Sequence, residues 1–137
     1  GGHAASPTYE QVCTGTTGHA EMVKVVFDNQ VVSYRRLLEE FFTMHDPTSL
    51  NRQGGDVGSQ YRSAVYYAND NQREAIESGT KLYAAALTGA GHGAIVTEVR
   101  SSEGMTFWRA EEYHQRYLEK NPNGYDCHAH TGFFLPA

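Results

Sequence analysis

Glu21 is the carboxyl group whose position in the sequence best fits proton transfer. It begins an alternation in which Val23, Val25 and Phe27 fall on one face of an extended segment. A carboxyl group at the rim of an apolar wall loses hydration, which raises its pKa and suits it to donate a proton near neutral pH. Because strands also begin at the solvent edge, a fully hydrated Glu21 is the alternative that this pattern leaves open.

A second carboxylate lies in the long polar segment 47–61. Glycines bracket Asp56, and Tyr61 closes the segment. Glycine lets a backbone approach a ligand closely, and loops longer than about 12–15 residues in a compact domain are often functional. We interpret the segment as part of a small-molecule site, with a mobile surface turn as the alternative. It is not a phosphate-binding loop, because it lacks Gly-x-x-x-x-Gly-Lys-Ser/Thr.

The histidines invite a test for metal ligation. The run 127–130 reads Cys-His-Ala-His, and Glu111 and His114 form one Glu-x-x-His. Di-iron bundles need two such motifs, and His-Glu-x-x-His is absent, so we expect no metal and no other cofactor. A metal-dependent hydrolase remains as an alternative; it would use His45, His114, His128 and Glu111.

The two cysteines, Cys13 and Cys127, are too few for a disulfide framework and lack Cys-x-x-Cys spacing. A thiol in an exposed tail can reach a partner and take part in disulfide exchange. The alternative is one adventitious surface thiol and one packed thiol, and spacing alone leaves both readings open. Phe107 and Trp108, with the tyrosines, either line an apolar pocket or belong to the core.

Composition bounds the remaining possibilities. The chain has 137 residues, 39% of them hydrophobic and 20% charged, which indicates one globular domain. The formal charge of −5 argues against a nucleic-acid partner, and no apolar run is long enough to span a membrane. The sequence opens at Gly1 without Met or a signal peptide, and we expect processing or a missing N-terminal segment, and a cytoplasmic location.

Hydrophobic periodicity and turn residues predict the elements that position these groups. Residues 1–18 read as loop, and 121–137 as a strong turn followed by an irregular tail. Between them we expect a strand over 19–28, a helix capped by Ser33 and ended by Pro47, a strand over 62–68, a helix capped by Asn69 or Asp70, a strand over 94–100 and a short helix over 111–120. The inner face of the second helix should carry Ala75, Ile76, Gly79, Leu82 and Tyr83. This order predicts a single α+β domain over 1–137, a two-layer sandwich.

Together these segments resemble the A-type peptide methionine sulfoxide reductases. The matching motifs run along nearly the whole chain: Gly1-Gly2-His3, Pro7-Thr8-Tyr9, Val12-Cys13, Thr17-Gly18-His19-Ala20-Glu21, His45-Asp46-Pro47-Thr48, residues 51–64, Thr97-Glu98, residues 111–118 and Asn121-Pro122-Asn123-Gly124-Tyr125. The resemblance implies a ferredoxin-like core with helices on a mixed or antiparallel sheet.

The resemblance also implies a reaction and its participants. A thiolate attacks the sulfur of methionine S-sulfoxide, free or in proteins, and leaves methionine and a sulfenic acid; a second cysteine then forms a disulfide that thioredoxin reduces. The family's acid falls on Glu21, the phenols on Tyr9 and Tyr61, the pocket aspartate on Asp56 and the resolving thiol on Cys127. We expect the protein to be a monomer without a membrane partner.

Two departures qualify this assignment. The family's nucleophile lies in Gly-Cys-Phe-Trp-Gly, which this sequence lacks, and Cys13 matches a family cysteine without that role. We therefore expect an N-terminally incomplete domain, short of a strand-helix-strand part and inactive by itself, with a catalytically dead module that binds oxidised methionine as the alternative. Cys127 follows Tyr125 by two positions instead of one, which makes its assignment weaker than that of Glu21.

Overall fold

A parallel pair of strands joined by a long helix forms the centre of the protein. In this computed structural model, which describes residues 1–126, β3 (Ala64–Tyr67) pairs with β4 (Glu98–Ser101), and Ala64 lies opposite Glu98. α3 (Asp70–Gly89) provides the crossover between them, as a parallel pair requires. Asn69 caps α3 by accepting a 2.9 Å hydrogen bond from the Gln72 amide, which confirms the predicted helix start.

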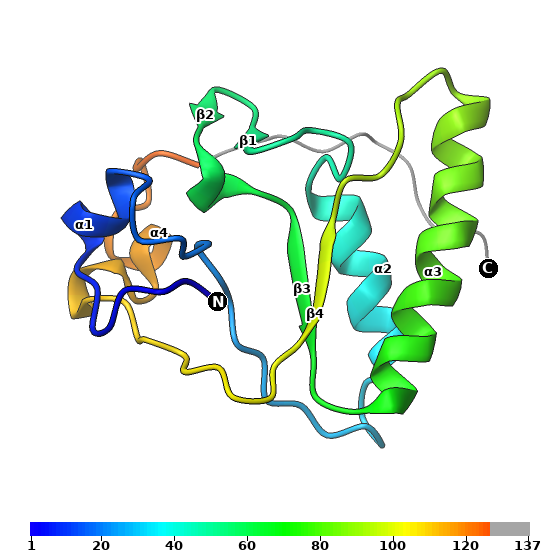
Figure 1. Cartoon of the computed structure of the whole chain (residues 1–137), viewed down its shortest axis with the longest axis horizontal. Helices are drawn as coiled ribbons and strands as arrows, with labels where there is room; N and C mark the ends of the chain where they lie inside the picture. Colours follow the sequence, from blue (N-terminus) through cyan, green and yellow to red (C-terminus); the bar gives the residue numbers. More distant parts are fainter. Residues whose placement is uncertain (127–137) are drawn as a thin grey trace.

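The helix α2 (Tyr34–Met44) packs on α3 and with it encloses the core. Figure 1 shows both helices on the same side of the β3–β4 pair. Phe42, Tyr83 and Leu87 are fully buried there, and the Phe42 and Tyr83 ring centroids lie 5.3 Å apart. The predicted cap at Ser33 is confirmed by its hydrogen bond from the Arg36 amide.

One predicted core position is wrong. Leu82 is 43% exposed, whereas Leu87, one turn beyond the predicted stripe, is completely buried. The buried positions Ile76, Tyr83 and Leu87 recur at spacings of seven and four, so the buried face of α3 is narrower than the sequence indicated.

The predicted strand over 19–28 is not formed. In the part of the chain described, the Glu21 amide bond to the Gln60 carbonyl oxygen, at 2.8 Å, is the only backbone bond of residues 19–27 to another segment. Val23 and Val26 are 84% and 89% exposed. An alternating pattern gives a strand only where a neighbouring strand accepts its backbone hydrogen bonds, and no described strand lies along this segment.

Two segments expected to be loops contain short regular elements. A capping box between Thr8 and Gln11 starts α1 (Tyr9–Cys13) within the first eighteen residues. In the polar segment 47–61, β1 (Arg52–Gln53) and β2 (Asp56–Val57) form an antiparallel hairpin, and η1 (Ser59–Tyr61) follows it. Pattern reasoning missed them because each is too short to show a period.

The predicted helix over 111–120 divides into η2 (Glu112–His114) and α4 (Tyr117–Lys120). Arg116 has a left-handed φ of 54°, which no residue inside an α-helix can adopt. The predicted turn that follows is confirmed by the Gly124 amide, which donates to the Asn121 carbonyl oxygen at 2.8 Å.

The end of the molecule opposite the core gathers segments from both halves of the chain. Figure 1 shows α1 and α4 on the far side of the β3–β4 pair from α2 and α3, with the β1–β2 hairpin at the edge between them. Within residues 1–126, no helix combines the length and apolar character that crossing a bilayer requires.

Candidate functional site

Glu21 lies on an extended segment that is hydrogen-bonded to Gln60, the residue before Tyr61. Its amide donates to the Gln60 carbonyl oxygen, and its side chain reaches the surface. Partial loss of hydration raises the pKa of Glu21, the charge of His114 opposes this rise, and the charge of Asp56 adds to it. Glu21 is thus both an exposed and a partly desolvated carboxyl group, a combination that the sequence offered only as two alternatives.

Tyr61, the last residue of η1, supplies a phenol near this carboxyl group. Burial raises the pKa of Tyr61, and the negative charge of Glu21 raises it further. A phenol with a raised pKa keeps its proton at neutral pH and can donate a hydrogen bond to an oxygen atom.

Tyr9, the first residue of α1, supplies a second phenol. A hydrogen bond with the Cys13 side chain is the largest cause that raises the pKa of Tyr9 to about 12, and the charges of Tyr61 and Glu21 contribute as well. Cys13, which is exposed and not in a disulfide, therefore lies against a predicted site residue, although the sequence motif gave it no part in the reaction.

Asp56 lies at the turn of the hairpin, opposite Gln53. Its Oδ2 accepts a 3.0 Å hydrogen bond from the hydroxyl of Tyr125. The chain leaves the hairpin through Gly58, whose φ is 148° and whose added Cβ would lie 2.2 Å from Oε1 of Gln60. Glycine is thus required where the hairpin turns toward Tyr61.

His114 is the residue that sequence reasoning did not assign to this site. The centroids of its ring and the Tyr9 ring lie 4.3 Å apart, and its buried Nε2 has no hydrogen-bond partner among the described residues. Its charge acts on the Glu21 carboxyl group. The Glu-x-x-His spacing did single His114 out, but as a metal ligand, because only the fold shows that Tyr9 and Glu21 are its neighbours.

Glu111, three residues earlier, holds the start of α1. Its Oε1 accepts a 2.9 Å hydrogen bond from the Tyr9 amide, and this bond lowers the pKa of Glu111. The first turn of a helix has free amide groups that favour such a carboxylate. Glu111 and His114 together therefore fix Tyr9 from the C-terminal half of the chain.

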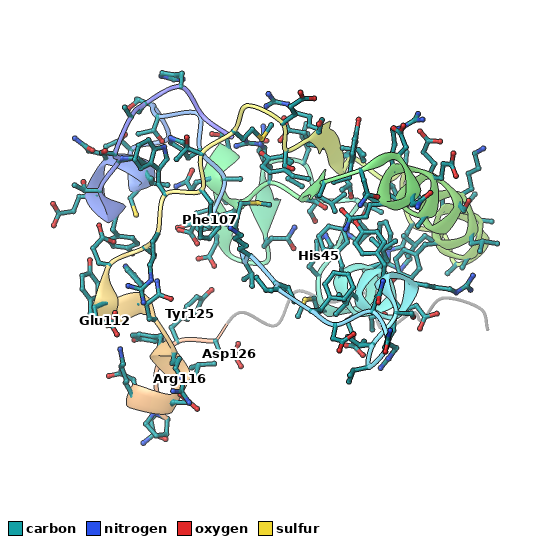
Figure 2. The ribbon with its side chains drawn as sticks, turned by 90° about the horizontal axis from the view of Figure 1, so that it is seen from below. His45, Phe107, Glu112, Arg116, Tyr125 and Asp126 are labelled. Atoms are coloured by element: carbon teal, nitrogen blue, oxygen red, sulfur yellow. The ribbon has the colours of Figure 1, made fainter. Side chains whose placement is uncertain are left out.

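The remaining candidates lie elsewhere. Cys127 falls outside the described residues. Across residues 1–126, no three His, Cys, Asp or Glu side chains lie close enough together to hold a metal ion. His45, one of the four residues of the hydrolase alternative, lies among the side chains of the helical core, far from Glu112 and Tyr125 (Figure 2). Phe107 and Trp108 are 47% and 40% exposed, so the reading that placed them in the core is wrong.

The carboxyl group, the two phenols and the aspartate that the motifs selected therefore lie within electrostatic range of one another. A family model described as peptide methionine sulfoxide reductase matches residues 1–135. The chain belongs to the peptide methionine sulfoxide reductase family. Curated relatives of the chain carry the name MsrA, so the A type predicted from the motifs is confirmed.

Two curated relatives show the extent of the similarity. The chain is 49% identical over 136 residues to the peptide methionine sulfoxide reductase MsrA of Streptomyces griseus, covering 99% of this chain and 61% of that protein. It is 55% identical over 133 residues to MsrA of Natronomonas pharaonis, covering 96% of this chain and 71% of that protein. The chain thus spans about three fifths of the length of the Streptomyces reductase.

Solved structures of the family confirm the α+β fold. Methionine sulfoxide reductase A of Corynebacterium diphtheriae superposes with a TM-score of 0.81 at 40% identity, covering 100% of this chain and 68% of that one. The reduced form of Mxr1 from Saccharomyces cerevisiae superposes with a TM-score of 0.78 at 35% identity, covering 94% of this chain and 67% of that one.

Proposed function

We propose that this chain forms the proton-donating part of an enzyme that reduces methionine S-sulfoxide, free or in proteins, to methionine. The observation that carries the proposal is that Glu21, whose pKa is raised, is bonded through its amide to the residue before Tyr61 and lies within electrostatic range of the protonated phenols of Tyr9 and Tyr61. A sulfoxide oxygen can leave sulfur only after gaining protons, and a neutral carboxylic acid beside two phenols supplies that need.

In the proposed reaction a thiolate attacks the sulfoxide sulfur, and Glu21 gives its proton to the oxygen. The attack forms a bond between the two sulfur atoms. The protonated oxygen then passes from the methionine sulfur to the cysteine sulfur as the sulfur–sulfur bond breaks, so that methionine leaves and the cysteine becomes a sulfenic acid. The thiol of Cys127 then condenses with the sulfenic acid to form a disulfide and water. Thioredoxin reduces this disulfide by giving up two electrons from its own dithiol.

The attacking thiol is proposed to lie outside residues 1–137. Neither Cys13 nor Cys127 stands in the family's Gly-Cys-Phe-Trp-Gly motif. We therefore expect residues 1–137 alone to bind methionine S-sulfoxide weakly and to reduce none of it with dithiothreitol. Measured turnover by the isolated chain would contradict this part of the proposal.

The activity itself is tested in a chimera. This chain replaces the residues of the Streptomyces griseus reductase that it matches, and reduction of methionine S-sulfoxide is followed with dithiothreitol. Because general acid catalysis contributes about 10²–10⁴-fold, Glu21→Gln should lower kcat by that order. Glu77→Gln, on the exposed face of α3, is the matched control and should leave kcat unchanged. An active chimera in which both variants behave alike would rule out Glu21 as the acid.

A further inference from the structure

The guanidinium group of Arg62 joins three segments of the chain. Its Nη2 donates to the Gly18 carbonyl oxygen at 2.9 Å, its Nη1 to the Ser59 carbonyl oxygen at 2.8 Å, and its Nε to Oε2 of Glu98 at 3.1 Å. These partners lie before Glu21, in η1 and at the start of β4. The Arg62 side chain is only 16% exposed, so water competes little for these bonds.

Arg62 completes a second attachment between the two segments that carry the proposed proton donors. The Glu21 amide already binds the Gln60 carbonyl oxygen, and the Arg62 side chain binds the Gly18 carbonyl oxygen. Tyr61 lies between Gln60 and Arg62 in sequence. A single bond would let the extended segment pivot around Gln60, whereas two bonds three residues apart fix its direction.

We propose that Arg62 is a positioning residue that fixes the separation between Glu21 and Tyr61. The role in sulfoxide reduction rests on the proposed function, but the positioning itself is a property of the fold. Arg62 acts through the Gly18 and Ser59 carbonyl oxygens, which are its hydrogen-bond partners on the two segments.

Glu98 keeps Arg62 in this geometry. Partial burial disfavours the charged form of Glu98, but hydrogen bonds from Arg62 and Tyr66 outweigh that effect and hold its pKa below the ordinary value. Glu98 is therefore ionised at neutral pH and orients the planar guanidinium group. A lysine ammonium is a compact point charge and cannot reach all three partners at once, so only arginine fits this position.

Arg62 could affect the Glu21 pKa in two ways, and removal of Arg62 would shift that pKa in opposite directions in the two cases. If Arg62 acted only as a nearby positive charge, its loss would disfavour the carboxylate and raise the Glu21 pKa. If Arg62 positions the segment, its loss lets water reach the carboxyl group, and the pKa falls toward about 4.3, the value of a hydrated glutamate. The groups that also act on Glu21 are His114 and Asp56, which neither variant below changes.

The test is a carbon-detected NMR titration of Glu21 in the full chain. Arg62→Met should lower the Glu21 pKa, and Arg100→Met is the matched control, because Arg100 also pairs with Glu98, at 3.5 Å, but is not bonded to Gly18 or Ser59. If Arg62→Met loses its native near-ultraviolet spectrum, Arg62→Lys takes its place, since it keeps the charge and loses the three-way geometry. An unchanged or raised Glu21 pKa in the folded variant would overturn the proposal.

A kinetic measurement separates this inference from the proposed function. In the chimera, Arg62→Lys should lower kcat by roughly 10²-fold while KM changes less, as expected for a displacement of about 1 Å between reacting groups. The titration needs no activity, so an inactive chimera would count against the proposed function and leave the positioning result standing. A lowered pKa with unchanged kcat in an active chimera would overturn the catalytic part of the inference.

Discussion

The hydroxyl of Tyr125 donates a 3.0 Å hydrogen bond to Oδ2 of Asp56, and the two residues are 69 positions apart. This bond attaches the segment that follows α4 to the turn of the β1–β2 hairpin. Tyr125 precedes Cys127 by two residues, so the attachment also fixes where the chain departs toward the proposed resolving thiol.

Tyr125→Phe should loosen the hairpin. A hydrogen bond of this kind contributes about 0.5–1.5 kcal/mol, so the amides of Asp56 and Val57 should exchange up to about tenfold faster. Hydrogen exchange followed by NMR measures this directly, and Tyr67→Phe on β3 is the control. Equal exchange rates in Tyr125→Phe and the unmodified chain would show that the bond does not hold the hairpin.

Glu21 should make stability depend on pH. Its pKa is raised in the folded state, so its contribution to stability is present below the unfolded pKa of about 4.3 and is lost as the pH rises through the folded value. Glu21→Gln cannot ionise and should therefore raise the urea midpoint at about pH 8 while changing it little at about pH 4. A gain that is the same at both values would contradict the assigned direction of the shift.

A partly buried chain of hydrogen bonds connects the helical core to the sheet. Because the Phe41 carbonyl oxygen can only accept, Nδ1 of His45 donates to it, and Nε2 accepts from Ser63 at 2.7 Å. The Ser63 hydroxyl in turn accepts from Thr97 at 2.7 Å. Burial lowers the pKa of His45, which keeps its ring neutral as this arrangement requires.

Ser63→Ala should therefore destabilise the protein by about 1–3 kcal/mol, because it leaves two partly buried polar groups, on His45 and Thr97, without their partner. Urea denaturation measures the loss, and Ser78→Ala on the exposed face of α3 is the control. If the two variants unfold at the same urea concentration, the bond chain contributes nothing measurable.

The corrected helix face provides a matched pair on α3. Leu87→Ala removes a fully buried side chain and should cost about 2–5 kcal/mol, whereas Leu82→Ala, at a position 43% exposed, should cost less than about 0.5 kcal/mol. Thermal or urea unfolding of the two variants distinguishes the observed face from the predicted one, for which Leu82→Ala would also be costly.

The two long helices were predictable because their signals are local. Ser33 and Asn69 cap them by bonds to amides three residues away, and apolar residues recur at helical spacing. The strand over 19–28 failed for the opposite reason. Its alternating pattern is also local, but a strand exists only when another segment accepts its hydrogen bonds.

The candidate site shows the same division. Glu21 and Tyr61 could be selected from motifs, because residue type and order are properties of the sequence. The parts played by His114 and Arg62 could not, since no local pattern indicates either part. Each is defined by its neighbours: the ring of Tyr9 for His114, and the Gly18 carbonyl oxygen for Arg62.

By itself, the sequence determined which groups are available for chemistry, where the capped helices begin and which family the chain belongs to. The tertiary structure alone decided that Tyr9, Glu21, Asp56, Tyr61 and His114 meet, and that partial loss of hydration raises the pKa of the carboxyl group among them. The physical reason is that hydration, charge interaction and hydrogen bonding depend on distances in space, and these residues come from segments up to 105 positions apart.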